Sequence, residues 1–204
     1  MWEILFFTLF LREIHVFMTT FLETVSDFFP SDEVILSFFE NETESVEVKK
    51  GELISTHDSL NRNVYFVEKG LVRSFYYEGG KDITTNFYSE GRLFANIDTL
   101  FDEKPTKYTI EAIEDTKIAF CNYLKLEKLC DQSLSAANFS RYILGKLMTQ
   151  MADRIASLQY MTAKEKYAKL MEEHPDIILR APLGMIATYL GISQETLSRI
   201  RSSI

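Results

Sequence analysis

Pro182–Ile204 has the sequence PLGMIATYLGISQETLSRIRSSI and carries the clearest structural pattern in the chain. We expect a helix over Leu183–Leu190, with Pro182 in its first turn, where a missing N–H costs nothing. Gly191 can adopt the positive φ that a tight turn requires. Ser193 is a favourable N-cap for a second helix. The segment therefore predicts two helices joined by a tight turn.

The second helix is expected to have one apolar and one polar side. Leu197, Ile200 and Ile204 recur at helical spacing and form the apolar face. The other side carries polar and charged residues: Gln194, Glu195, Ser198, Arg199 and Ser202. A guanidinium can donate to guanine O6 and N7, and a carboxylate can accept from cytosine N4. The alternative to contacts with a ligand is that Glu195 and Arg199 only form an i, i+4 ion pair with each other on a solvated helix face, worth about 0.3–0.5 kcal/mol.

Composition indicates an ordinary folded protein with an uneven charge distribution. The 204 residues are 46% hydrophobic and 25% charged, which excludes a disordered tail, a coiled-coil rod and a collagen-like chain. The formal net charge of −8 by itself argues against nucleic-acid binding. Residues 141–204, however, hold 9 Lys and Arg against 6 Asp and Glu. The negative net charge of the whole chain therefore comes from residues 1–140, and residues 141–204 form a mildly basic segment.

Few residues are available for metal or nucleophilic chemistry. Cys121 and Cys130 are too few for a disulfide framework, a four-cysteine zinc site or an iron–sulfur cluster, and they fit a reducing compartment. The three histidines stand apart, and only His57 merits a test as a haem ligand. A cupin-type enzyme is an alternative, but its metal site needs clustered histidines and carboxylates. We therefore expect no enzymatic activity, no catalytic residue, no metal site and no cofactor.

From Ser45 to about Phe120 the sequence period changes to two. Short runs rich in β-branched and aromatic residues, separated by Gly and Pro turn signals, predict an antiparallel sandwich or barrel. Gly79-Gly80 between two such runs is a strong hairpin signal. The runs are Val46–Val48, Val64–Val67, Leu71–Tyr77, Ile83–Tyr88, Tyr108–Ile113 and Lys117–Phe120.

Helical periodicity flanks this region. We expect one helix over Thr20–Phe29, a second that begins after an N-cap at Ser31 or Asp32, and a third over Tyr123–Cys130. A long helix over 135–161 would extend about 40 Å. Its apolar stripe favours a two-stranded coiled coil with a second copy of the chain, and the alternative is packing on its own sheet. The expected dimer-interface residues are Ile143, Leu144, Leu147, Met151, Ile155 and Leu158.

Two further segments complete the chain. Thr162–His174 predicts a helix that ends at Pro175, followed by the short apolar stretch Ile177–Leu179. At the other end, the apolar run Ile4–Leu11 is much shorter than the roughly 20 residues of a bilayer span. We expect a hydrophobic extension over 1–17 or a natural start at Met18, and a targeting or membrane role is the alternative.

The two-helix segment resembles the helix-turn-helix of the Crp–Fnr family of bacterial transcription regulators. The match lies in apolar, small and glycine positions around the turn: Ile186, Ala187, Leu190, Gly191, Ile192, Leu197 and Ile200. In the family's recognition helix, a Glu and an Arg four residues later read a G·C pair. The resemblance implies those roles for Glu195 and Arg199. It implies further DNA contacts at Ser193, Gln194, Ser198 and Arg201, with phosphate contacts at Lys164, Lys166, Lys169, Arg180 and Arg201.

The resemblance also implies an α+β fold and a set of partners. It predicts an antiparallel jelly-roll sensor domain of the cyclic-nucleotide-binding type over 18–133, a dimerisation helix over 134–161 and an all-α helix-turn-helix domain over 162–204. The implied partners are double-stranded DNA, a second copy of the chain and RNA polymerase, in the cytoplasm and without a membrane. Family members usually continue into a β-hairpin wing, so we expect a wingless subgroup or a clipped chain.

The phosphate-binding cassette departs from the family's pattern. The family has a Gly-Glu-Leu turn followed by an Arg-Ser pair, and this chain has Ala95-Asn96-Ile97 and Thr106-Lys107 in the matching places. Lys107 lacks the two-pronged donor geometry of an arginine, so cyclic AMP and cyclic GMP are not expected to bind. The candidate ligand-pocket residues are Arg92, Ala95, Asn96, Thr106 and Lys107. The alternative function is a ligand-binding or interaction module with a vestigial DNA-binding tail.

Overall fold

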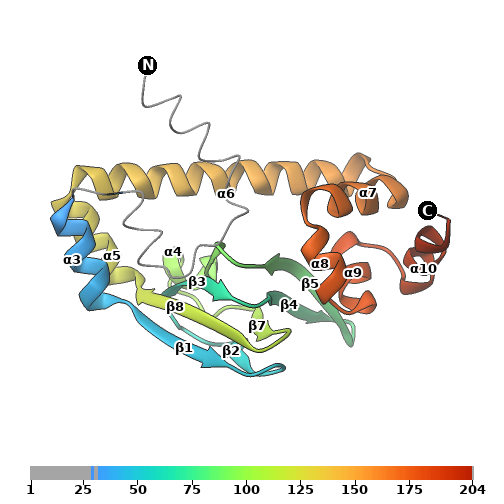
Figure 1. Cartoon of the computed structure of the whole chain (residues 1–204), viewed down its shortest axis with the longest axis horizontal. Coiled ribbons are helices and arrows are strands. Elements are labelled where there is room, and N and C mark those ends of the chain that lie inside the picture. Colours follow the sequence, from blue (N-terminus) through green and yellow to red (C-terminus); the bar gives the residue numbers. More distant parts are fainter. Residues whose placement is uncertain (1–28, 30–31, 204) are drawn as a thin grey trace, which may run out of the picture.

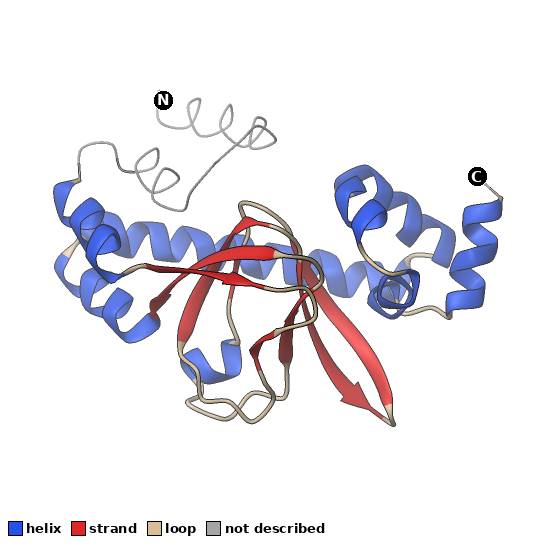
Figure 2. Cartoon of the chain, turned by 60° about the horizontal axis from the view of Figure 1, so that its bottom comes forward, coloured by secondary structure: helices blue, strands red, loops and turns tan. Residues whose placement is uncertain are grey.

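A computed structural model describes residue 29 and residues 32–203 of the chain (Figure 1). Two antiparallel sheets form a jelly roll, α6 runs along one side of it, and helices gather at both of its ends (Figures 1 and 2). The expected α+β architecture is therefore confirmed. The extension expected over 1–17 and nearly all of the helix expected over 20–29 lie outside the described residues. None of the described helices is long and apolar enough to cross a membrane.

The jelly roll consists of two four-stranded sheets whose neighbouring strands are all antiparallel. The first sheet has the order β1-β8-β3-β6, with β1 at Glu44–Val48, β8 at Thr116–Asn122, β3 at Asn63–Lys69 and β6 at Leu93–Phe94. The second has the order β2-β7-β4-β5, with β2 at Leu53–Ser55, β7 at Thr109–Ala112, β4 at Val72–Glu78 and β5 at Lys81–Tyr88. Six strands correspond to the expected runs. β2 and β6 are too short to show an alternating pattern.

The hairpin between β4 and β5 confirms the prediction from its glycine pair. Glu78 pairs with Lys81, and Gly79 and Gly80 have φ values of 57° and 75°. Two central residues with positive φ match the right-handed twist of the flanking strands. Side chains from both sheets fill the interior of the roll: Val48, Tyr65, Val67, Val72, Phe94, Ile110, Ala112 and Ile118.

One end of the roll is covered by α3 (Glu33–Glu42), α5 (Tyr123–Gln132) and the start of α6 (Leu134–Tyr160) (Figure 1). The side chain of Asp32 accepts a hydrogen bond from the Ile35 N–H at 3.2 Å, so Asp32 is the N-cap of α3. A buried apolar cluster joins these elements: Ile35, Phe39, Cys121, Leu129 and Ala136. Burial raises the pKa of the Cys121 thiol to about 11, so this thiol stays protonated and unreactive.

At the other end, α6 leads into four short helices: α7 (Ala163–Glu173), α8 (Pro175–Arg180), α9 (Leu183–Leu190) and α10 (Gln194–Ser202) (Figure 1). Thr162 and Glu165 form a reciprocal capping box at the start of α7. The helix expected over Thr162–His174 is confirmed as α7, which ends just before Pro175, but the sequence did not predict that a further helix begins there. Pro175 is the first residue of α8, where its fixed φ suits a helix start.

Candidate nucleic-acid interface

The turn between α9 and α10 has the geometry that the sequence predicted. Gly191 has φ 67° and ψ 35°, a left-handed conformation that glycine adopts without strain. The Ile192 N–H donates to the Ala187 carbonyl at 3.0 Å. The Ser193 side chain accepts from the Thr196 N–H at 3.2 Å and caps α10. These local bonds set the angle at which α10 leaves α9.

Helix α10 is anchored by one side and exposed on the other. Leu197 is 0% exposed and belongs to the same apolar cluster as Ile186, Ala187 and Leu190 of α9. Ile200 packs partly against that cluster, whereas Ile204 lies outside the described residues. Glu195, Ser198, Arg199 and Arg201 are exposed on the other side. The helix therefore presents a polar surface of a shape that fits a DNA groove.

Glu195 and Arg199 remain free to meet a ligand. No ion pair joins these two side chains in the part of the chain that the structure describes, and the Arg199 guanidinium donates to Thr196 Oγ1 at 3.3 Å. Hydrogen bonds with its own backbone N–H and with Ser193, and more weakly the charge of Arg199, lower the pKa of Glu195. The ionised carboxylate is an acceptor only, as pairing with cytosine N4 requires.

Ser193 and Gln194, two further predicted DNA contacts, are exposed but lie against other parts of the two-helix segment. The Ser193 hydroxyl caps α10 and also bonds to Thr196 Oγ1 at 3.1 Å. The Gln194 side-chain oxygen lies 3.2 Å from the point where a Cβ on Gly184 would stand. Gln194 thus folds back over α9, and the small residue at 184 makes room for it.

The predicted phosphate contacts fall into two groups: three of them interact within the protein, and the other two are exposed. Arg180 was expected on phosphate, but its guanidinium is paired with Glu90 and Glu114 of the jelly roll, at 2.9 and 2.6 Å. Lys166 donates to the Leu158 carbonyl at the end of α6, and Lys169 lies 3.8 Å from Glu173. Lys164 and Arg201 are exposed and remain available for phosphate.

The exposed apolar face of α6 is rotated slightly about the helix axis relative to the stripe that the sequence predicted. Ile143 and Leu147 are half-buried, whereas Met148, which the sequence analysis omitted, is 71% exposed. Leu134 and Tyr160 are exposed at the two ends of the helix. Between them the exposed large apolar residues are Leu144, Met148, Met151, Ile155 and Leu158, called the α6 stripe below. They are spaced alternately by four and three residues, which is the a/d spacing of a two-stranded coiled coil.

The candidate nucleotide-pocket residues bond within the protein. Asn96 is 5% and Thr106 0% exposed. Asn96 donates to Ser55 Oγ at 3.1 Å, and Thr106 Oγ1 accepts from the Tyr108 N–H at 3.1 Å. Ala95 is half-buried beside Asn96. Asn96 and Thr106 thus each have a hydrogen-bond partner within the jelly roll.

The two cations of the candidate pocket do not converge on an anion site. The Lys107 Nζ lies over the rings of Tyr76 and Tyr108, at 5.4 and 5.2 Å from their centroids. Arg92 is exposed, and its carbonyl accepts from the Val67 N–H at 3.0 Å. His57 is exposed, 3.8 Å from Asp58. An open, shallow pocket of about 510 Å³ lies elsewhere, lined by Val46, Glu47, Val48, Glu52, Leu53, Ile54, Asn61, Asn63, Tyr65, Ile118 and Phe120.

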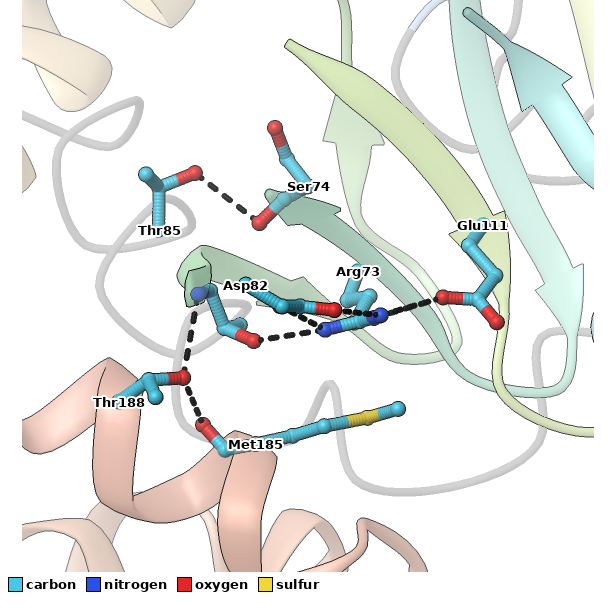
Figure 3. Close-up of polar contacts among 8 residues, drawn as sticks. Arg73, Ser74, Asp82, Thr85, Glu111, Met185 and Thr188 are labelled. Carbon is cyan, nitrogen blue, oxygen red and sulfur yellow. Dashed lines mark hydrogen bonds and ion pairs between the residues drawn. The ribbon is translucent and has the colours of Figure 1, made fainter. Parts of the chain in front are cut away.

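A buried charge cluster on β4 has no counterpart in the sequence analysis (Figure 3). Arg73 is 3% exposed and donates to both carboxylate oxygens of Asp82 at 2.7 Å and to Glu111 at 2.8 Å. It also donates to Thr84 Oγ1 at 3.1 Å. The Thr84 N–H in turn donates to Thr188 Oγ1 of α9 at 3.2 Å. The local signal was one arginine in a strand of mainly apolar and aromatic residues.

Comparison with known proteins gives consistent matches. Residues 45–133 match the model of the cyclic nucleotide-binding domain. The chain is 22% identical over 171 residues to the transcriptional regulatory protein btr of Bordetella pertussis, covering 78% of this chain and 70% of that protein. FixK2 of Bradyrhizobium japonicum has 25% identity and a TM-score of 0.70, covering 79% of this chain and 83% of that one. A Eubacterium rectale structure described as belonging to the crp/fnr family has 18% identity and a TM-score of 0.64, covering 82% and 81%.

Proposed function

Because residues 45–133 match the cyclic nucleotide-binding domain and the chain is similar to the transcriptional regulatory protein btr and to FixK2, we propose that it is a transcription regulator of the Crp–Fnr type that binds inverted-repeat DNA as a homodimer. Helix α10 is the recognition helix in this proposal, and α6 pairs the two copies. No enzymatic activity is proposed.

The observation that carries the proposal is the two-sided environment of α10. Leu197 is fully buried, whereas Glu195 and Arg199 are exposed and not paired with each other. An arginine that met guanine would make two hydrogen bonds, and the glutamate four residues earlier would accept from the paired cytosine. Arg201 and Lys164 would add phosphate contacts, which strengthen binding without reading sequence.

The α6 stripe supports the homodimer. Its members range from 38% to 71% exposed, and a helix with such a continuous apolar seam is stable when a partner covers it. In a two-fold dimer the two α10 helices would enter successive major grooves, about 34 Å apart. An inverted-repeat site follows from that symmetry.

Cyclic nucleotides are not proposed as effectors. Asn96 stands where the family's cassette has an acidic residue, and it bonds to Ser55. Thr106 stands where the family has an arginine, and it is fully buried. A cyclic phosphate at this point would lack the arginine that the family supplies there.

Selection of bound fragments from a random double-stranded DNA library, with the purified full chain, tests the proposal. We expect enrichment of a palindrome whose half-sites are centred about 10–10.5 base pairs apart. Arg199→Ala should enrich a palindrome that has lost its preference at one G·C pair of each half-site. Arg141→Ala, an exposed arginine at the other end of α6, should retain that preference. A wild-type chain that enriches no DNA would contradict the proposal and favour an interaction module.

A further inference from the structure

Arg180 connects the helix-turn-helix segment to the jelly roll. It is the last residue of α8, and its side chain is 23% exposed. Its guanidinium donates to both carboxylate oxygens of Glu90 at 2.9 Å and to those of Glu114 at 2.6 and 3.2 Å. Two-pronged pairs of this kind are geometrically specific. The partners are 90 and 66 residues away in sequence.

The acceptors on the jelly roll are themselves held in place. Glu90 Oε1 also accepts from the Gly70 N–H at 2.8 Å. Burial opposes ionisation of Glu90, but hydrogen bonds from Arg180 and from backbone N–H groups outweigh it, so the pKa of Glu90 lies below its ordinary value. The Glu90 carboxylate that receives Arg180 is thus ionised and is held by a backbone hydrogen bond of the jelly roll.

An apolar contact and a backbone bond lie beside this ion cluster. Leu71 and Ile113 of the jelly roll are 0% and 5% exposed and belong to the core cluster of the C-terminal helices. The rings of Phe87 and Tyr189 meet edge to face with centroids 5.2 Å apart. Thr188 of α9 accepts from the Thr84 N–H, and Figure 3 shows this bond beside the Arg73 cluster.

The docked side of the helix-turn-helix segment is not its DNA side. The contacts to the jelly roll come from α8 and α9, whereas Glu195, Ser198 and Arg199 of α10 remain exposed. Docking therefore leaves the recognition surface uncovered. Together with the direct contact of Arg154 of α6 with the carbonyl and ring of Tyr189 of α9, docking orients α10 with respect to α6. In a dimer this orientation sets the spacing of the two recognition helices.

We propose that β5, the neighbouring residues Leu71 and Ile113, and the turns at Glu90 and Glu114 form a docking surface for the chain's own helix-turn-helix segment, with Arg180 as the positioning residue. Arg180 then supports DNA binding through its carboxylate partners and not through phosphate. This inference rests on the proposed function for its consequence in DNA recognition.

Two variants separate positioning from phosphate contact: Arg180→Gln and the double variant Glu90→Gln with Glu114→Gln. Binding is measured on the selected palindrome and on a single half-site, over a salt series. Positioning predicts that both variants weaken palindrome binding by a similar factor of at least about fivefold. It also predicts that half-site binding and the salt slope stay unchanged.

A phosphate contact predicts a different pattern. Arg180→Gln alone would weaken binding to both DNAs and reduce the logarithmic salt slope by about 0.9, whereas removing two carboxylates would leave binding equal or tighter. That result would overturn the proposal. Arg62→Gln is the matched control, because Arg62 is 22% exposed and pairs with Glu103 within the jelly roll. It should leave palindrome binding unchanged.

Hydrogen exchange of the DNA-free protein tests docking separately from DNA recognition. Backbone amides of α8 and α9 should exchange faster in Arg180→Gln and in the double glutamine variant, and not in Arg62→Gln. Unchanged exchange in Arg180→Gln or in the double variant would overturn the docking surface. If the wild type selects no DNA while exchange responds as expected, the proposed function fails and the docking surface stands.

Discussion

Ile155→Glu tests whether α6 pairs with a second copy of the chain. Ile155 lies between Met151 and Leu158 in the α6 stripe and is 53% exposed. A coiled-coil partner would cover the exposed part and would bring the two Ile155 positions to one seam. The substitution replaces this apolar area with a carboxylate on each helix.

The exposed fraction sets the size of the effect. Full burial of an isoleucine side chain is worth about 1.5–3 kcal/mol, so covering the remaining 53% contributes about 0.8–1.6 kcal/mol per copy. The two copies together contribute about 1.6–3.2 kcal/mol. The dimer dissociation constant should therefore rise by about 15- to 200-fold. Repulsion between two carboxylates adds to this value.

Sedimentation velocity over a concentration series at fixed salt measures that constant. Leu179→Glu is the matched control, since Leu179 is 85% exposed but lies on α8, away from the stripe. The control should leave the constant within about twofold of the wild type. If Ile155→Glu also leaves it unchanged, or if the wild type sediments as a monomer throughout, the assignment of α6 as the dimer helix is refuted.

Three further predictions concern α10 and the candidate nucleotide pocket. Arg199→Ala should cost about 1–3 kcal/mol on the selected palindrome and abolish preference at one G·C pair; an equal loss on all DNA sequences would place Arg199 on phosphate. Leu197→Ala should lower the free energy of unfolding by about 2–5 kcal/mol in chemical denaturation, because Leu197 is 0% exposed, whereas the exposed Ser198→Ala should change it by less than about 0.5 kcal/mol. Cyclic AMP should give no rise in melting temperature, and a rise that grows with its concentration would contradict the interpretation of Asn96 and Thr106.

Local sequence patterns predicted much of the candidate interface. The turn at Gly191, the cap at Ser193 and the burial of Leu197 all follow from residues within a few positions of one another. The six longer strands and the hairpin at Gly79-Gly80 follow from alternation and turn chemistry. These features depend on backbone preferences that each short segment satisfies by itself.

Other side chains could not be placed from local patterns. Met148 replaces Ile143 and Leu147 in the exposed stripe because the rotation of α6 depends on what packs against it, and neighbouring stripes on a helix differ by one residue. Gln194 is polar and lies on a helix surface, but its position over Gly184 depends on how closely α9 and α10 approach.

The sequence by itself determined that the chain ends in two helices joined by a tight turn, preceded by a β domain and a long helix with an apolar stripe. Only the tertiary structure decided the partners of its charges. Arg180 is a cation on a basic segment and by pattern alone suits phosphate, yet it pairs with Glu90 and Glu114 across 90 and 66 residues. Periodicity records which side of an element is apolar, whereas ion pairs between distant segments depend on how the folded chain brings those segments together.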